Sequence, residues 1–196
     1  MDDFKKSAEH RISRLHVPTE NELDDSIKPV IAENKRLNGY VENWLLSLAL
    51  NPETLKRSLV FFESLFNPGT SQIESAEREM IALIVSAENG CAYCEAHHTK
   101  GLAREIKDPT RARRIGLGYE HVPDLTPREH AIANLATKIT RDPKSVSDQD
   151  IDDLRNLGLD DKAILEVIET AAFFNFTNRI SIPLKNPPED ALFDLK

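Results

Sequence analysis

The chain contains two cysteines, Cys91 and Cys94, which are separated by two residues and follow the turn-forming pair Asn89-Gly90. If a helix begins at Cys91, this spacing places both sulfur atoms on one side of it, within reach of a disulfide after modest adjustment. The free N–H groups and positive dipole end of a helix N-terminus favour thiolate over thiol. Such surroundings lower a cysteine pKa from about 8.5 to roughly 3.5–7.5. The pair therefore predicts a thiol-based redox enzyme.

Histidines and carboxylates near the cysteines are candidates for moving protons. His98 follows Cys94 by four residues, so a helix places its imidazole on the side of that thiol. There the imidazole could accept the thiol proton and later protonate a leaving oxygen. His97 lies somewhat off this common face, and the sequence favours His98 without excluding His97. Three local carboxylates could orient the imidazole: Glu79, Glu88 and Glu95. Glu79 would face the site if its helix packs antiparallel against the cysteine helix.

The apolar pattern along the chain is helical almost throughout, without the alternation that predicts strands. Residues 18–37 read as two short helices or as one helix kinked at Pro29. Further helices are expected over residues 40–50, 54–66, 73–88, 91–106, 126–140, 147–157 and 160–180. We predict an all-α bundle of about eight or nine helices. Residues 1–196 are expected to form one domain, with arms at 1–17 and 183–196.

Charge and hydropathy exclude several classes of protein. The formal net charge is −8, and the short basic block at residues 111–114 reads as a solvated helix face, so nucleic-acid binding is not expected. No stretch of 18 apolar residues predicts a membrane span, and the N-terminus lacks the apolar core of a signal peptide. We therefore expect a cytoplasmic protein, in a compartment where disulfides are usually catalytic or sensing.

A longer pattern surrounds the cysteines. Eleven residues separate Glu79 from Cys91-Ala92-Tyr93-Cys94, and three more separate Cys94 from His98. This pattern resembles the E-x11-C-x-x-C-x3-H signature of the alkyl hydroperoxidase D-like family, within the carboxymuconolactone decarboxylase superfamily. Residues 12–14, 140–143 and 173–179 resemble its peroxidase-related branch. The resemblance implies an all-α fold, a homo-oligomer (a trimer or hexamer) and hydroperoxide-reducing or disulfide-reducing activity.

The resemblance also implies roles for single residues. Cys94 would be the peroxidatic sulfur and Cys91 the resolving one, with Glu79 and His98 as the proton relay. The substrate would be a hydroperoxide, and a dithiol protein or lipoyl-type donor would reduce the disulfide, without a cofactor or a metal ion. One departure concerns Tyr93, where the best-known member of the family has a histidine. A phenol with a pKa near 10 cannot replace an imidazole as a base at neutral pH.

Other interpretations of the same residues remain. Cys91, Cys94 and His98, with His97 or Glu79, could offer four zinc ligands, although ligands crowded into one short helix suit tetrahedral geometry poorly. The pair could instead be two buried structural thiols, or switch the assembly of a redox-responsive protein that is not an enzyme. A carboxymuconolactone decarboxylase-like lactone decarboxylase is a further alternative, but that chemistry has no evident need for two cysteines.

Three polar side chains interrupt the apolar helix near its C-terminal end: Asn175, Asn178 and Arg179. They would either line the pocket or form hydrogen bonds across a subunit interface. The sequence does not choose between these roles.

Overall fold

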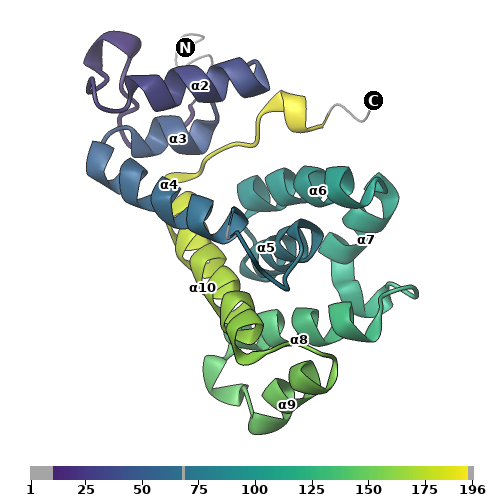
Figure 1. The fold of residues 1–196 in the computed structure, drawn as a ribbon. Coiled ribbons are helices and arrows are strands. Elements are labelled where there is room, and N and C mark those ends of the chain that lie inside the picture. The colour runs from purple at the N-terminus through teal and green to yellow at the C-terminus, as the bar shows by residue number, and fades with distance from the viewer. Residues whose placement is uncertain (1–10, 68, 194–196) are drawn as a thin grey trace.

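The computed structural model describes residues 11–67 and 69–193, and every regular element in this part of the chain is helical, which confirms the all-α prediction (Figure 1). The nine α-helices found there agree with the expected eight or nine. They are α2 (Lys28–Asn38), α3 (Asn43–Leu48), α4 (Pro52–Phe66), α5 (Ser75–Asn89), α6 (Ala92–Ile106), α7 (Pro109–Gly118), α8 (Pro127–Arg141), α9 (Asp148–Asn156) and α10 (Asp161–Leu184). Short 3-10 helices are η1 (Glu20–Glu22), η2 (Tyr119–His121), η3 (Pro143–Ser145) and η4 (Asp190–Leu192).

Helix α5 lies at the centre of the bundle, and α6, α7, α8 and α10 all pack against it (Figure 1). Every side chain from Met80 to Ser86 is buried, as expected of a helix that is covered on all sides. Arg78 on the same helix is almost fully buried, and its Nη2 donates to Glu166 on α10 at 2.6 Å and to Ser71 at 2.7 Å. Removing one partner of a buried ion pair costs about 3–5 kcal/mol, so this pair holds α10 firmly against α5.

The turn between α5 and α6 determines where the cysteines lie. Gly90 adopts a φ of 68°, in the left-handed region that glycine enters without a steric penalty. The N–H groups of Gly90 and Cys91 donate back to the carbonyls of Ala87 and Ser86, which ends α5 within one turn. Cys91 then becomes the N-cap of α6. The two helices therefore form a tight antiparallel hairpin with the cysteine pair at its closed end.

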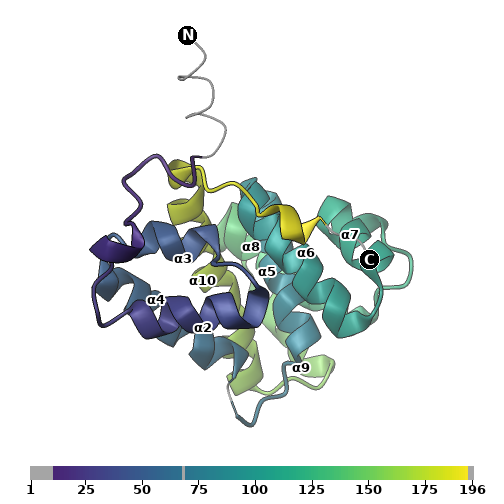
Figure 2. The same cartoon turned by 90° about the horizontal axis from the view of Figure 1, so that it is seen from above.

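Helices α2, α3 and α4 form a second layer with its own small core (Figure 2). Its buried members are Leu23, Ile27, Ile31, Leu45, Leu48, Ala49 and Leu55. Trp44 on α3 packs against both this core and a third cluster, formed by Cys91, Tyr93 and Cys94. The cysteine pair thus lies where the N-terminal layer meets the central bundle.

Several helix boundaries differ from the prediction by a few residues, including the start of α5 and the end of α10. Helix α5 begins at Ser75 instead of residue 73, with a capping box between Glu74 and Glu77. Helix α10 continues past Ile180 to Leu184, with Pro183 in its last turn. Arg14 stabilises that end, since its backbone N–H and Nη1 donate to the carbonyls of Leu184 and Pro183.

The basic block lies on α7, a helix that the sequence left unassigned although Asp108 and Pro109 begin it as N-cap and first residue. Arg113 and Arg114 are exposed, as expected, but Arg111 is partly buried and pairs with Asp124 and Glu129. Among the helices of residues 11–67 and 69–193, none is long and apolar enough to cross a membrane. Residues 1–10 of the expected N-terminal arm lie outside the described part.

Candidate functional site

The two cysteines are free thiols whose Sγ atoms lie 2.6 Å apart at the start of α6. This separation exceeds the length of a disulfide bond, about 2.05 Å, so the two residues are not covalently linked. Both side chains are buried, with Cys91 exposed by 2% and Cys94 by 6%. The two thiols therefore lie next to each other and are largely shielded from solvent.

The two thiols differ in acidity. Hydrogen bonding with Cys94 lowers the pKa of Cys91 below its usual range, and Asn178 and Ser181 on α10 lower it further. The same hydrogen bond raises the pKa of Cys94, and burial raises it further. Of the two thiols, Cys91 at the N-cap of α6 is therefore the one that ionises more readily.

Helices α5 and α6 bring Glu79 and His98 together. His98 Nδ1 lies 2.8 Å from Glu79 Oε2, and both side chains are 13% exposed. The His98 ring also packs edge-on against Phe174, with 4.5 Å between the ring centroids. Because the carboxylate occupies Nδ1, Nε2 is the ring nitrogen left to exchange a proton with another group. Of the other local carboxylates, Glu88 instead pairs with Arg141 at 2.6 Å.

Gly101 on α6 provides the space that Glu79 occupies. A Cβ atom added at Gly101 would lie 2.5 Å from Cδ and 2.7 Å from Oε1 of Glu79. Atoms cannot approach this closely, so a larger residue would displace the carboxylate. Sequence reasoning missed Gly101, although a glycine inside a predicted helix often has a packing reason.

Replacing Gly101 with alanine is expected to push Glu79 away from His98. We expect a loss of about 1–3 kcal/mol in the free energy of unfolding, the usual cost of overpacking, measured by urea denaturation. Adding Glu79→Asp to Gly101→Ala should recover part of that loss, because the shorter side chain leaves room for the new methyl group. Equal stability of the Gly101→Ala variant and the wild type would contradict this account of the glycine.

A second histidine–carboxylate pair lies on the other side of α6. His97 Nε2 is 2.8 Å from Glu189 Oε2, and the hydroxyl of Tyr93 donates to Glu189 Oε1 at 3.2 Å. Burial and the nearby Glu189 carboxylate raise the pKa of Tyr93, so its phenol stays protonated and serves as a donor. Sequence reasoning missed Glu189, which lies in the expected C-terminal arm.

The polar residues of α10 bond within the chain. The Asn178 side chain is fully buried and donates to the Ser86 hydroxyl at 3.1 Å. Asn89, at the end of α5, donates to the side-chain oxygens of both Asn178 and Asn175 at 3.0 Å. Arg179 donates to Asn175. These side chains therefore join α10 to the end of α5, immediately before the cysteine pair.

Within the described residues, no three His, Cys, Asp or Glu side chains are grouped so that they could hold a metal ion. His97 and His98 turn instead toward separate carboxylates, Glu189 and Glu79. The arrangement proposed for zinc, with the cysteines and these side chains around one point, is therefore not found there.

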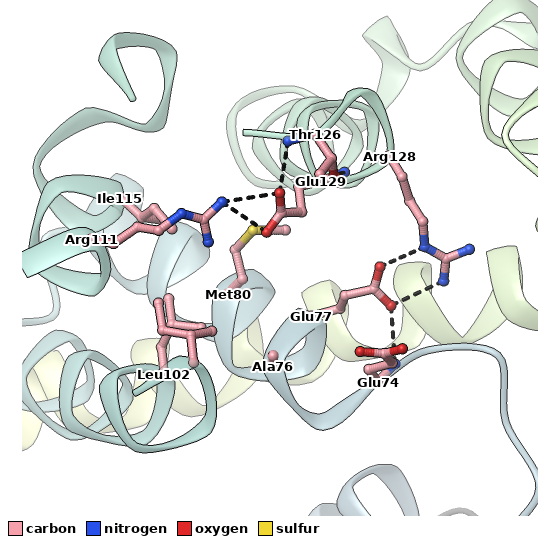
Figure 3. A pocket seen from close by; sticks show the side chains of 11 residues that line it. Glu74, Ala76, Glu77, Met80, Leu102, Arg111, Ile115, Thr126, Arg128 and Glu129 are labelled. Carbon is pink, nitrogen blue, oxygen red and sulfur yellow. Dashed lines mark hydrogen bonds and ion pairs between the residues drawn. The ribbon is translucent and has the colours of Figure 1, made fainter. Parts of the chain in front are cut away.

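A pocket of about 240 Å³ lies apart from the cysteines, lined by residues of α5, α6, α7 and α8 (Figure 3). Arg111 and Arg128 face it, but each is paired with a carboxylate, Glu129 and Glu77 respectively. None of the predicted site residues lines this pocket. Both arginine charges of the pocket are therefore neutralised by carboxylates that also line it.

The geometry can be compared with known proteins. Residues 52–115 match the carboxymuconolactone decarboxylase family. An alkylhydroperoxidase AhpD core protein from Ralstonia eutropha JMP134, described as an uncharacterized peroxidase-related protein, is 30% identical, with a TM-score of 0.89 over 94% of this chain and 96% of that one. An uncharacterized peroxidase-related protein from Silicibacter sp. TM1040 is 28% identical, with a TM-score of 0.87 over 93% and 95% of the two chains.

A more distant structure shares the fold alone. The debrominase Bmp8 is 18% identical, with a TM-score of 0.76 over 94% of this chain and 95% of that one. No curated protein matches the chain. The family is assigned by the 30% sequence identity to the Ralstonia protein over nearly the whole of both chains, together with the family match over residues 52–115. The chain belongs to the alkyl hydroperoxidase D-like proteins of the carboxymuconolactone decarboxylase superfamily, in their peroxidase-related branch.

Proposed function

We propose that the protein is a thiol-dependent hydroperoxide reductase that uses Cys91 and Cys94 as its redox pair. The observation that carries this proposal is the 2.6 Å separation of the two sulfur atoms on the helix that also holds His98 against Glu79. A pair of thiols that can close to a disulfide, with a proton-transferring imidazole on the same helix, is what reduction of an O–O bond requires. The peroxidase-related description of two similar structures supports the same class of reaction.

The proposed reaction begins at the dithiol. Cys94 loses its proton to His98, and its sulfur attacks the terminal oxygen of the hydroperoxide. An S–O bond forms and the O–O bond breaks, so that Cys94 becomes a sulfenic acid. The departing alkoxide takes the proton from His98 and leaves as an alcohol. This sequence follows the predicted role of Cys94. Because hydrogen bonding with Cys91 and burial raise the pKa of Cys94, the transfer of its proton to His98 is an essential first step.

The second half of the cycle restores the thiols. The sulfur of Cys91 attacks the sulfenic sulfur, so that an S–S bond forms and the S–O bond breaks. The departing hydroxide takes up the proton that the Cys91 thiol releases, and leaves as water. A dithiol reductant, either a protein or a lipoyl-type donor, then returns two electrons by thiol–disulfide exchange. We propose that this cycle operates in a cytoplasmic homo-oligomer, a trimer or hexamer.

Anaerobic thiol titration tests the proposal directly. One equivalent of hydroperoxide per chain should remove both thiols, because the sequence holds two cysteines and the proposed product is their disulfide. A dithiol such as dithiothreitol should restore both. Unchanged thiol content after peroxide addition would contradict the proposal. A zinc assay on the same sample tests the competing interpretation, which would be favoured by one bound zinc per chain together with thiols that resist peroxide.

A further inference from the structure

The cysteine pair is covered by two aromatic residues. Trp44 of α3 and Tyr93 of α6 pack against Cys91 and Cys94 in one cluster. The two sulfur-bearing side chains are almost inaccessible, although in the proposed function a hydroperoxide and a reductant must both reach them. Whatever holds these aromatic residues in place therefore controls access to the redox pair.

Glu189 connects the elements that carry this cover. Its Oε1 accepts from the backbone N–H of Asn43 at 2.5 Å, next to Trp44 at the start of α3, and from the Tyr93 hydroxyl at 3.2 Å. Its Oε2 pairs with His97 of α6 at 2.8 Å. Tyr93 in turn accepts from the backbone N–H of Trp44 at 3.2 Å. One carboxylate thus joins α3, α6 and the segment after α10.

The Glu189 carboxylate is suited to this position by its charge and burial. Its side chain is only 10% exposed. Burial raises its pKa, but hydrogen bonds from His97 and the Asn43 backbone more than offset this, so its pKa lies below the usual range and the group is ionised. Hydrogen bonds to an ionised acceptor are about twice as strong as those between neutral groups.

The segment on either side of Glu189 is also fixed across α3 and α6. The Asn43 side chain donates to the carbonyl of Pro187 at 2.9 Å, and Lys100 Nζ donates to the carbonyl of Ala191 at 2.7 Å. Figure 1 shows this segment in yellow, passing between α3 and α6. Among the described residues of this segment, Glu189 is the one that forms a hydrogen bond with Tyr93.

We propose that Glu189 is a positioning residue that holds Trp44 and Tyr93 over the cysteine pair and thereby determines the size of molecule that reaches the sulfur atoms. Small hydroperoxides gain access with the cover in place, whereas a bulky dithiol reductant requires Glu189 to release it. This inference deepens the proposed function by defining access to the same site. It requires no peroxidase activity for its test.

The experiment compares two thiol reagents of different size on the reduced full-length protein. Methyl methanethiosulfonate reports the intrinsic reactivity of the thiols, and 5,5′-dithiobis(2-nitrobenzoate) reports the access of a bulky disulfide. Glu189→Ala removes the three hydrogen bonds that the charged carboxylate accepts. The rate with the bulky reagent, divided by the rate with the small one, should therefore rise at least about tenfold. Glu189→Gln keeps an acceptor oxygen and should stay close to the wild-type ratio. Asp190→Ala is the matched control, since it removes an adjacent exposed carboxylate.

Trp44 gives a second readout, because it is the single tryptophan of the chain. Its emission should shift to longer wavelength in Glu189→Ala, as the indole becomes hydrated, and should stay unchanged in Asp190→Ala. A loss of overall stability alone would not change the rate ratio selectively. If Glu189→Ala fails to fold by circular dichroism, His97→Ala removes one of the same hydrogen bonds from the α6 side and is measured instead.

Two results would overturn the inference: an unchanged reagent ratio in the folded variant, or an unchanged Trp44 emission. The outcomes also separate this inference from the proposed function. A protein whose reagent ratio responds to Glu189→Ala but whose thiols ignore hydroperoxide would retain the access role and lose the peroxidase assignment. A protein that consumes hydroperoxide, but whose reagent ratio is unchanged in Glu189→Ala, would retain the peroxidase assignment and lose the access role of Glu189.

Discussion

Replacing Cys94 with serine is expected to abolish hydroperoxide consumption. A hydroxyl is a far weaker nucleophile than a thiolate near neutral pH, and it cannot form the disulfide that completes the cycle. The measurement is steady-state peroxide loss with excess dithiothreitol. Fold integrity is checked by circular dichroism, because the pair lies in a buried cluster.

Replacing Cys91 with serine should give a different result under the same conditions. Without a resolving thiol, the oxidised Cys94 should persist as a sulfenic acid that dimedone traps, detectable as one adduct per chain by mass spectrometry. The opposite pattern, with activity lost in Cys91→Ser and the adduct on Cys91 in Cys94→Ser, would exchange the two roles. That exchange would agree with the lowered pKa of Cys91. Full activity in both variants would refute the thiol mechanism.

Replacing Glu79 with glutamine should lower kcat/KM for hydroperoxide by about 10²-fold, within the range for losing a general acid–base group. The amide is nearly isosteric but uncharged, so it no longer stabilises a protonated His98 across their 2.8 Å contact. His98→Gln should cause a similar loss. Because the two residues act as a unit, the double variant should lose little more than either single one.

The matched control for Glu79→Gln is Glu88→Gln. Glu88 lies on the same helix and also forms an ion pair, but its partner is Arg141, outside the site. We expect its kcat/KM to stay within about threefold of wild type, since surface ion pairs contribute about 0–1 kcal/mol. Equal losses of kcat/KM in Glu79→Gln and Glu88→Gln would mean that Glu79 affects activity only through the stability of the fold. Additive losses in the Glu79–His98 double variant would mean that the two residues do not work together as a relay.

The helices and the centre of the site were accessible from sequence because their determinants are local. Apolar periodicity and caps such as Asn51-Pro52 and Thr126-Pro127 locate most helices. Glu79 and His98 meet because a hairpin with a short turn at Gly90 forces residues on either side of it into contact. Only the antiparallel packing of two consecutive helices had to be assumed.

The contacts that sequence reasoning missed depend on residues far apart in the chain. Glu189 meets His97 across 92 positions, and no local pattern indicates which helix the C-terminal segment will reach. Arg78 likewise donates to Glu166, which lies 88 positions further along the chain. The role of Gly101 becomes visible only when the Glu79 side chain is seen to fill the missing Cβ position.

The α5–α6 hairpin has a consequence for how such a protein can be altered. Glu79, both cysteines, His98 and Gly101 all lie in this one continuous stretch, which falls inside the family match over residues 52–115. These side chains could therefore be transferred between homologues together, as one continuous segment of sequence. Glu189, by contrast, lies beyond it near the end of the chain. Recombining the tail of one homologue with the hairpin of another should therefore change which molecules are admitted while the reactive groups stay the same.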